Sequence, residues 1–188
     1  MRANTRDASL LQLSTTGLLA IDLQQPLLDV MWNQEELIAN VRRLAEAARI
    51  LDLPVVVTEQ NPQKLGPTAP CIADTIADGS PVPKMAFSCC REKRVMDSLR
   101  ALGRATWLLC GVEAHVCVSQ TVLDLLDHEY QVQIVADAVG SRTQANWEAG
   151  LGRARQAGAV ITTTEMALFE LLERAGTEQF RAVHRLIR

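Results

Sequence analysis

Short apolar runs alternate with amphipathic segments of helical length along most of this 188-residue chain, and this alternation limits how it can fold. Short apolar runs bounded by turn residues are typical of buried strands. Because strands that alternate with helices pair in parallel, the pattern predicts an α/β fold in which helices cover both faces of a parallel sheet. We interpret as strands residues 18–22, 55–58, 106–111, 132–136 and 159–162, with a weaker, Pro-interrupted third strand within residues 79–87.

The segments between these runs have the period of amphipathic helices. In residues 37–51 the apolar residues recur at spacings of three and four, whereas arginines occupy the opposite face. A second helix is expected to begin at or just before Cys117. A third is expected to begin at a cap on Ser141 or Thr143 and to end near Gly158, because hydroxyl side chains cap helix starts and glycine favours helix ends.

The length of the chain suits one domain with a two-sided core, since domains commonly contain roughly 100–200 residues. We therefore expect residues 1–188 to form a single domain, with a core at about residues 16–175 and no second domain. Hydrophobic residues make up 48% of the chain and charged residues 22%, which is ordinary for a globular protein.

Charge and hydropathy argue against two classes of partner. The net charge is −3 and the basic residues are scattered, whereas nucleic-acid binding needs clustered Lys and Arg. No run approaches the ~18 apolar residues that span a membrane. The apolar stretch within residues 1–15 is too short for the core of a signal peptide. We therefore expect a cytoplasmic protein that binds neither nucleic acid nor membrane.

The cysteines favour a reduced protein. Their odd number and the lack of C-x-x-C or zinc-finger spacing argue against a disulfide framework or a zinc site. Cys110 lies inside an apolar run and is interpreted as a core residue, since free cysteine is usually buried. The adjacent Cys89 and Cys90 are interpreted as structural or incidental. The five cysteines are Cys71, Cys89, Cys90, Cys110 and Cys117.

Three charged or reactive residues lie where apolar runs give way to turns. Asp22 closes the first run, Lys84 lies in the Pro-rich third, and Cys117 follows the fourth after a short loop. Packing alone does not explain such residues at these points, and parallel α/β sheets bind ligands at the carboxyl ends of their strands. These three residues are therefore the candidate functional groups.

These residues and their neighbours resemble the isochorismatase-like cysteine hydrolase family, from about Gly17 to Thr164. The family implies a three-layer, doubly wound, mostly parallel sheet of about six strands in the order 3-2-1-4-5-6. That order would bring Asp22 and Cys117 together across 95 positions. The resemblance rests on Gly17-Leu-Leu-Ala-Ile-Asp22, Pro81-Val-Pro-Lys84-Met-Ala-Phe-Ser88 and Gly111-Val-Glu-Ala-His-Val-Cys117-Val118, and a subgroup of isochorismatase domain-containing proteins is similar at Thr58-Glu-Gln-Asn-Pro-Gln-Lys-Leu-Gly-Pro-Thr68.

The resemblance implies a catalytic triad of Asp22, Lys84 and Cys117. Cys117 would attack as a thiolate, and we expect a helix N-terminus and Lys84 to lower its pKa from about 8.5. Asp22 would act as general base and then acid, while Lys84 keeps Asp22 ionised and orients the pair. By resemblance the backbone N–H groups of Glu113 and Cys117 form an oxyanion hole, next to a cis peptide bond between Val112 and Glu113.

The reaction that the resemblance implies is hydrolysis of a small amide, urea-like or related acyl compound through a thioester. Isochorismatases that split a vinyl ether lack the nucleophilic cysteine, so isochorismate is not the expected substrate. Neither a metal nor an organic cofactor is expected. The nicotinamidase branch has an Asp-x-His metal site where this chain has Glu59, Gln60 and Asn61.

Five further residues are candidates for lining the substrate pocket. For two of them, Gln24 and Phe87, ordinary packing around strand ends is an equally good interpretation. His115 lies two positions before Cys117, and a role in the pocket or at a subunit contact is favoured over a Cys-His dyad. The candidate pocket residues are Gln24, Glu59, Gln60, Phe87 and His115.

Two other functions stay open. A scaffold or binding protein could keep the fold and the triad without turning over a substrate. Alternatively, Cys117 could be a reversible redox site, although Cys110, seven residues earlier inside a strand, is badly placed as a resolving thiol. The family usually forms closed oligomers, so a homodimer or larger assembly is expected.

Overall fold

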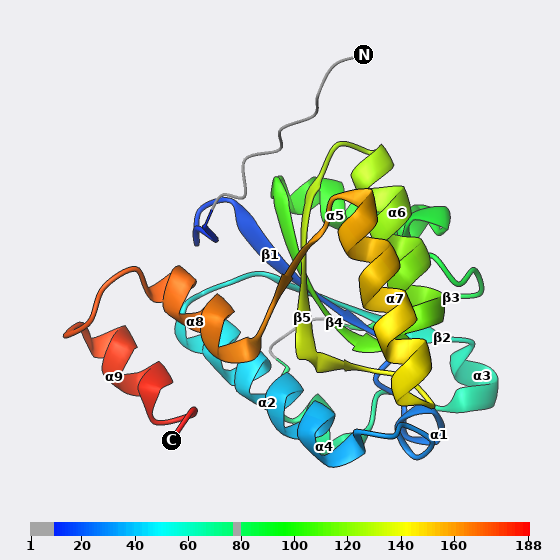
Figure 1. The fold of residues 1–188 in the computed structure, drawn as a ribbon, viewed down its shortest axis with the longest axis horizontal. Coiled ribbons are helices and arrows are strands. Elements are labelled where there is room, and N and C mark those ends of the chain that lie inside the picture. Colours follow the sequence, from blue (N-terminus) through cyan, green and yellow to red (C-terminus); the bar gives the residue numbers. More distant parts are fainter. Residues whose placement is uncertain (1–9, 77–79) are drawn as a thin grey trace.

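The computed structural model describes residues 10–76 and 80–188, and it contains a sheet of six parallel strands with helices on both faces (Figure 1). The strand order β3-β2-β1-β4-β5-β6 confirms the predicted doubly wound α/β fold. Residues 1–9 of the predicted domain, and residue 79 at the start of the weaker third strand, lie outside the described residues. The strands are β1 Thr16–Ile21, β2 Val55–Gln60, β3 Val82–Lys84, β4 Thr106–Val112, β5 Gln131–Gly140 and β6 Val160–Thr162.

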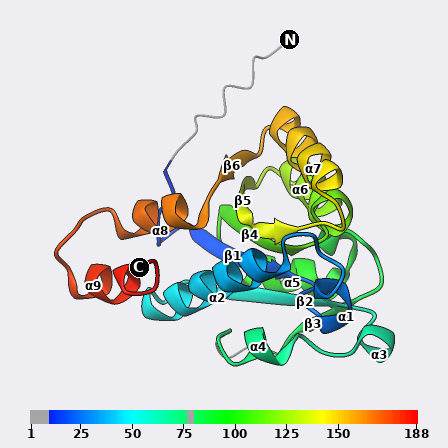
Figure 2. The ribbon, with the colours of Figure 1, turned by 60° about the horizontal axis from the view of Figure 1, so that its bottom comes forward.

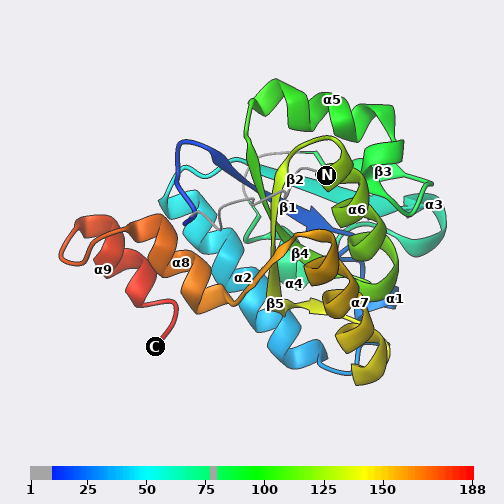
Figure 3. The ribbon, with the colours of Figure 1, turned by 45° about the horizontal axis from the view of Figure 1, so that its top comes forward.

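The longer helices form two groups on opposite faces of the sheet (Figures 2 and 3). One face is covered by α2 and α8, with α9 packed against both and α4 beside α2; the other is covered by α5, α6 and α7. The short helices α1 and α3 contact each other. The bounds are α1 Gln25–Leu28, α2 Gln34–Ile50, α3 Pro62–Leu65, α4 Pro70–Ala73, α5 Lys93–Leu102, α6 Ser119–Asp127, α7 Gln144–Ala157, α8 Thr164–Leu172 and α9 Glu178–His184.

The side chains of each central strand divide between two hydrophobic clusters. On β1, Leu18 and Ala20 join the cluster under α2 and α8, whereas Leu19 and Ile21 join the cluster under α5, α6 and α7. Every residue of β1 is buried as a result. A strand covered on both faces reads as a continuous apolar run, which is why the central strands were recognisable in the sequence.

The helix ends follow local sequence signals. α7 begins at Thr143, whose hydroxyl accepts a hydrogen bond from the Asn146 N–H at 3.2 Å, and it ends at Gly158 with φ 106°. The structure thus selects Thr143 over Ser141 as the cap. α2 begins at Gln34, before the predicted start at residue 37, because its polar first turn carries no apolar signal.

The hydrophobic core extends beyond the range of residues 16–175. Leu11 and Val183 are buried in the cluster under α2 and α8, because the segment before β1 and helix α9 both pack on that side. In residues 10–76 and 80–188, no helix is long and apolar enough to cross a membrane.

Candidate active site

Strands β1, β3 and β4 bring Asp22, Lys84 and Cys117 together at the carboxyl edge of the sheet. Asp22 directly follows β1, Lys84 ends β3, and Cys117 lies in a π-helical turn, Ala114–Val118, between β4 and α6. Their exposed fractions are 0%, 2% and 7%. The predicted helix start at or just before Cys117 matches this turn, which continues into α6.

Lys84 and Asp22 form a buried ion pair. The Lys84 Nζ lies 2.7 Å from Asp22 Oδ2. It also donates to the Gln60 Oε1 at 2.6 Å and to the carbonyls of Ala86 and Phe87, both at 3.1 Å. Burial by itself lowers the pKa of Lys84, but the charge of Asp22, the thiols of Cys89 and Cys117 and the hydrogen bond to Asp22 together outweigh burial, and the pKa is raised. Lys84 is therefore an ammonium ion at neutral pH.

The carboxyl group of Asp22 has the opposite balance. Burial raises its pKa, even though the charge of Lys84 and hydrogen bonds from Lys84, Thr58 and Cys117 all favour the ionised form. The Thr58 hydroxyl donates to Asp22 Oδ1 at 2.8 Å. Asp22 is thus an ionisable carboxyl whose proton affinity exceeds that of an ordinary aspartate.

Cys117 is hydrogen-bonded to Asp22 through its side chain. Burial and the negative charge of Asp22 raise its pKa to about 12, although Lys84 acts in the opposite direction. The expectation of a lowered pKa is therefore wrong for the resting protein, because burial and the carboxylate outweigh the ammonium group. The resting cluster therefore holds Cys117 as a thiol and Lys84 as an ammonium ion beside the carboxyl group of Asp22.

The turn that carries Cys117 is fixed by close contacts. The peptide bond between Val112 and Glu113 is cis. The Glu113 carbonyl accepts hydrogen bonds from the N–H groups of Val116 and Val118 at 3.0 and 3.2 Å. Its carboxylate pairs with Arg142, with Nε 3.0 Å from Oε2. The hydrogen bonds to the Glu113 carbonyl and the ion pair of its carboxylate therefore both hold the backbone around the candidate oxyanion hole.

Two predicted pocket residues, Gln24 and Glu59, hold a loop through hydrogen bonds. Gln24 is fully buried, and its amide exchanges hydrogen bonds with the backbone of Gln60 (2.8 and 2.9 Å) and donates to the Gly66 carbonyl at 2.6 Å. Glu59 Oε1 accepts from the N–H and hydroxyl of Thr68 at 2.7 and 2.8 Å. These hydrogen bonds hold residues 61–68 against β1 and β2, and a pocket role for Gln24 and Glu59 stays a prediction.

Of the other three predicted pocket residues, Gln60 and Phe87 contact the Lys84 ammonium group. Gln60 accepts from Lys84 and donates through Nε2 to the Met85 carbonyl at 2.9 Å. Phe87 is 54% exposed, and its backbone carbonyl accepts a hydrogen bond from the Lys84 ammonium group. The Nδ1 of His115 lies 3.1 Å from the Ser141 hydroxyl, so that nitrogen is already engaged.

Sequence reasoning missed two members of the cluster, Thr58 and Cys89. Cys89 is fully buried, its Sγ lies 3.8 Å from the Thr58 Oγ1, and its charge state is coupled to Asp22 and Lys84. Thr58 could have been found, because a polar residue near the end of strand 2 faces the end of strand 1 in a parallel pair. Cys89 lies outside the strands and gave no such signal.

Within the two described segments, no three His, Cys, Asp or Glu side chains gather as a metal ion would require. The Glu59 carboxylate accepts two hydrogen bonds from Thr68.

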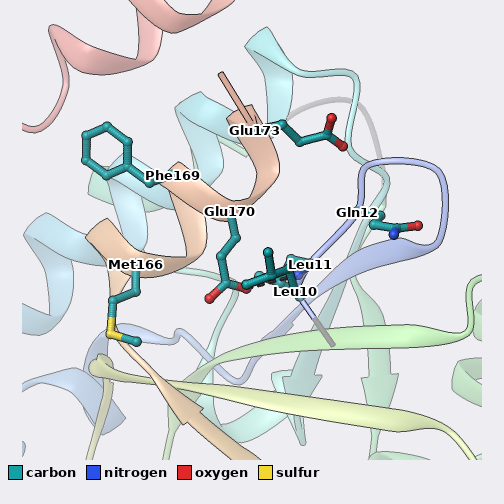
Figure 4. Close-up of a pocket in the computed structure, with 7 residues that line it drawn as sticks. All are labelled: Leu10, Leu11, Gln12, Met166, Phe169, Glu170 and Glu173. Atoms are coloured by element: carbon teal, nitrogen blue, oxygen red, sulfur yellow. Dashed lines mark hydrogen bonds between the residues drawn. The ribbon is translucent and has the colours of Figure 1, made fainter. Parts of the chain in front are cut away.

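A separate hollow of about 620 Å³ lies beside α8 (Figure 4). The Leu11 N–H donates to Glu170 Oε2 at 2.9 Å and ties the segment before β1 to this helix. The six residues of β1, roughly 20 Å of strand, separate this hollow from Asp22. Its lining contains none of the candidate catalytic residues and consists of Leu10, Leu11, Gln12, Met166, Phe169, Glu170 and Glu173.

Comparison with known proteins identifies relatives along nearly the whole chain. The isochorismatase domain matches residues 16–166. Isochorismatase domain-containing protein 2 of Danio rerio is 38% identical over 180 residues, which cover 94% of this chain and 89% of the relative. The secreted isochorismatase effector Isc1 of Phytophthora sojae is 38% identical over 177 residues, which cover 91% of this chain and 83% of the effector.

Solved structures share the same architecture. The MAR1 ribonuclease of Caenorhabditis elegans superposes with a TM-score of 0.89 at 36% identity, covering 95% of this chain and 92% of that one. The YcaC gene product of Escherichia coli, an octameric hydrolase of unknown specificity, superposes with a TM-score of 0.91 at 21% identity, covering 97% and 91%. With a family domain matched over most of its length and relatives at this level of identity, the chain belongs to the isochorismatase family of hydrolases.

Proposed function

We propose that this protein is a cysteine-dependent hydrolase of a small amide, urea-like or related acyl compound, with Asp22, Lys84 and Cys117 as its catalytic residues. The observation that carries the proposal is the buried contact among a thiol, a carboxylate and an ammonium group at the carboxyl edge of the sheet. A nucleophile within hydrogen-bond reach of a base, which a third group orients, is the arrangement that covalent acyl transfer requires.

The first half of the reaction is attack by the thiol on a carbonyl carbon. Asp22 takes the Cys117 proton as the Sγ–C bond forms, and the C–N bond breaks as Asp22 returns that proton to the leaving nitrogen. The N–H groups of Glu113 and Cys117 would stabilise the oxyanion, at a few kcal/mol per donor. The products are an amine or ammonia and a thioester on Cys117.

The second half is hydrolysis of the thioester. Asp22 removes a proton from water as the oxygen attacks the acyl carbon, and Cys117 leaves as a thiolate that regains the proton. The raised pKa values of Asp22 and Cys117 suit this cycle. Moving a proton from Cys117 to Asp22 leaves the total charge of the buried cluster unchanged, whereas releasing it to solvent would leave a buried negative charge.

A panel of small amides and ureas tests the proposal through ammonia release and the mass of the Cys117 peptide. We expect a transient acyl adduct on that peptide and loss of turnover in Cys117→Ala and Asp22→Asn. Cys110→Ala, which removes a buried thiol outside the cluster, should keep full turnover. Ammonia release that persists in Cys117→Ala would contradict the proposal.

The name of the Caenorhabditis elegans protein gives a second candidate, hydrolysis of RNA. The net charge of −3 and the scattered basic residues weigh against it, because RNA-binding surfaces concentrate positive charge. Single-stranded RNA belongs in the same panel. Cleavage by the wild type that Cys117→Ala abolishes would favour this candidate over amide hydrolysis. A scaffold would turn over neither class of compound.

We further propose that the protein is cytoplasmic and assembles with copies of itself. All five cysteines, which lie in the described part of the chain, are unpaired, as in a reducing compartment. The relative in Phytophthora sojae is named as secreted, so fractionation of the native cell is the relevant test. The octamer that the Escherichia coli protein forms makes self-association compatible with this fold.

A further inference from the structure

A line of three buried polar side chains runs back from the candidate catalytic carboxylate. The Thr58 hydroxyl donates to Asp22 Oδ1 at 2.8 Å, and the Cys89 Sγ lies 3.8 Å from the Thr58 Oγ1. Each of these side chains has an exposed fraction of 0%. In the resting structure these side chains are out of contact with solvent, so their polar atoms need partners inside the protein.

The direction of the hydrogen bonds follows from the number of protons. A threonine hydroxyl has one proton, and Thr58 uses it in the hydrogen bond that it donates to Asp22. Toward Cys89 the hydroxyl can therefore only accept, so the thiol is the donor. Burial and the charge of Asp22 raise the pKa of Cys89 to about 11, which keeps that S–H proton in place. The Cys89 N–H donates to the Thr121 hydroxyl at 2.9 Å and anchors the residue.

The two oxygens of Asp22 are thus held by different elements. Oδ2 faces Lys84 of β3 and Oδ1 faces Thr58 of β2. The titratable groups around the carboxyl are Lys84, Cys117 of the π-helical turn and Cys89 of the 3₁₀ turn Cys89–Arg91. Thr58 is a donor to the carboxyl that does not titrate, and Cys89 fixes which way the Thr58 proton points.

We propose that Thr58 and Cys89 are positioning residues that hold Asp22 ionised and oriented to receive the Cys117 proton. This inference rests on the proposed function and adds two residues to its machinery. A hydrogen bond to the charged form of an acid lowers its pKa. Without the Thr58 donor, Asp22 would take up a proton at higher pH and be unavailable as a base.

The rate of Cys117 alkylation by iodoacetamide, measured by peptide mass spectrometry across pH, reports whether Asp22 is ionised. When Asp22 is ionised, the thiol proton can pass to it and the sulfur reacts; when Asp22 is protonated, it cannot. We expect the acid limb of the profile to move up by about one pH unit in Thr58→Val. Thr58→Ser should restore it, and Cys89→Ala should give a smaller shift in the same direction.

We call the hydrogen bonds from Cys89 through Thr58 to Asp22 the relay. Two matched variants separate the loss of this relay from the general effects of a core substitution. Thr16 is a buried threonine at the far end of β1 whose hydroxyl has no hydrogen-bond partner within the described segments, so Thr16→Val should leave the limb in place. Cys110→Ala removes a buried thiol on the opposite face and should do the same. If Thr58→Val does not fold by circular dichroism, Thr58→Ala replaces it in the comparison.

The outcomes distinguish this inference from the proposed function. A wild-type acid limb that disappears in Asp22→Asn, but stays at the same pH in the Thr58 variant, overturns the relay and keeps the catalytic proposal. A wild-type profile that Asp22→Asn does not change removes the base from the mechanism, and both proposals fall together. A shift in Thr58→Val that Thr58→Ser fails to reverse would also count against the relay, because serine keeps the hydroxyl donor and the shift would then come from altered packing.

Discussion

Lys84 shows how much the state of one residue depends on its neighbour. Its ammonium group is buried and forms an ion pair with Asp22. Taking a charge out of water is costly, and a buried pair is tolerated because each charge compensates the other. Removing one partner leaves the other unpaired in the core, whereas removing both leaves two neutral side chains.

We therefore expect Lys84→Met to lower the free energy of unfolding by about 3–5 kcal/mol, and the added change Asp22→Asn to recover much of that loss. Urea denaturation at pH 7 measures both. Lys93 is the matched control: its ion pair with Asp97 is 87% exposed at the lysine, so Lys93→Met should cost less than about 1 kcal/mol. A double variant no more stable than Lys84→Met would contradict this account.

At the scale of elements, the position of the cluster depends on how closely β4 approaches β1. Gly111 lies on β4 with φ 113°, and a Cβ added there would lie 2.1 Å from the Ile21 carbonyl oxygen. No side chain fits this gap, because the atom it meets belongs to the backbone. Asp22, the candidate base, directly follows Ile21. The close approach of the two strands therefore fixes the backbone position from which the Asp22 side chain extends.

Gly111→Ala is accordingly expected to cost more than about 4 kcal/mol or to prevent folding, since both the φ angle and the space forbid a methyl group. Gly152 provides the contrast within α7, where an added Cβ meets nothing within 4 Å. Gly152→Ala should raise the free energy of unfolding by about 0.5–1 kcal/mol, because alanine favours a helix interior. Thermal unfolding of the two variants and of the wild type measures both changes in the free energy of unfolding.

The loop after β3 carries a pH-dependent prediction. Glu92 Oε1 accepts hydrogen bonds from the N–H groups of Ala86 and Met85, which lower the pKa of Glu92 below its ordinary 4.5. The ionised form thus stabilises the fold above pH 4.5, and this contribution is lost as the pH falls through the lower folded value. We expect Glu92→Gln to cost on the order of 0.5 kcal/mol at pH 7, because the group is exposed.

Urea titrations of Glu92→Gln and wild type at several pH values between 7 and about 3 test this sign. The difference between the two proteins should shrink as the pH falls below 4.5. A constant difference across that range would mean that the carboxylate charge does not hold the loop.

The same elements show what could be predicted from sequence. Central strands were recognisable because burial on both faces leaves apolar runs, whereas the strand order came from resemblance to a family. The roles of Gln24 and Glu59 could not be foreseen, because their partners are backbone atoms of a loop without periodicity. The pKa of Cys117 was misjudged for a related reason. Its depth and its contact with Asp22 exist only once β1 and β4 are paired.

At the scale of the whole molecule, the fold presents an acidic surface with some apolar groups. The net charge is −3, and exposed side chains such as Leu10, Met166 and Phe169 gather near the hollow at α8. Isolated apolar side chains are normal on a surface, so they do not by themselves define an interface.

For the assembly we expect a homodimer or larger closed oligomer. Light scattering coupled to gel filtration should give a mass that is two or more times the 20.7 kDa of one chain. The measurement should be repeated with Cys117→Ala, which lies in the buried cluster and should leave the mass unchanged. A mass of one chain at micromolar concentration would show that the protein acts as a monomer.

The central place of β1 in the sheet also bears on biosynthesis. β1 leaves the ribosome first, but its neighbours β2 and β4 are made later, and Cys117 emerges after all three. A nascent chain that ends before Cys117 holds Asp22 without the Cys117 thiol beside it. The reactive centre therefore comes into being only when the middle of the sheet closes, and unfinished chains released early from translation carry none.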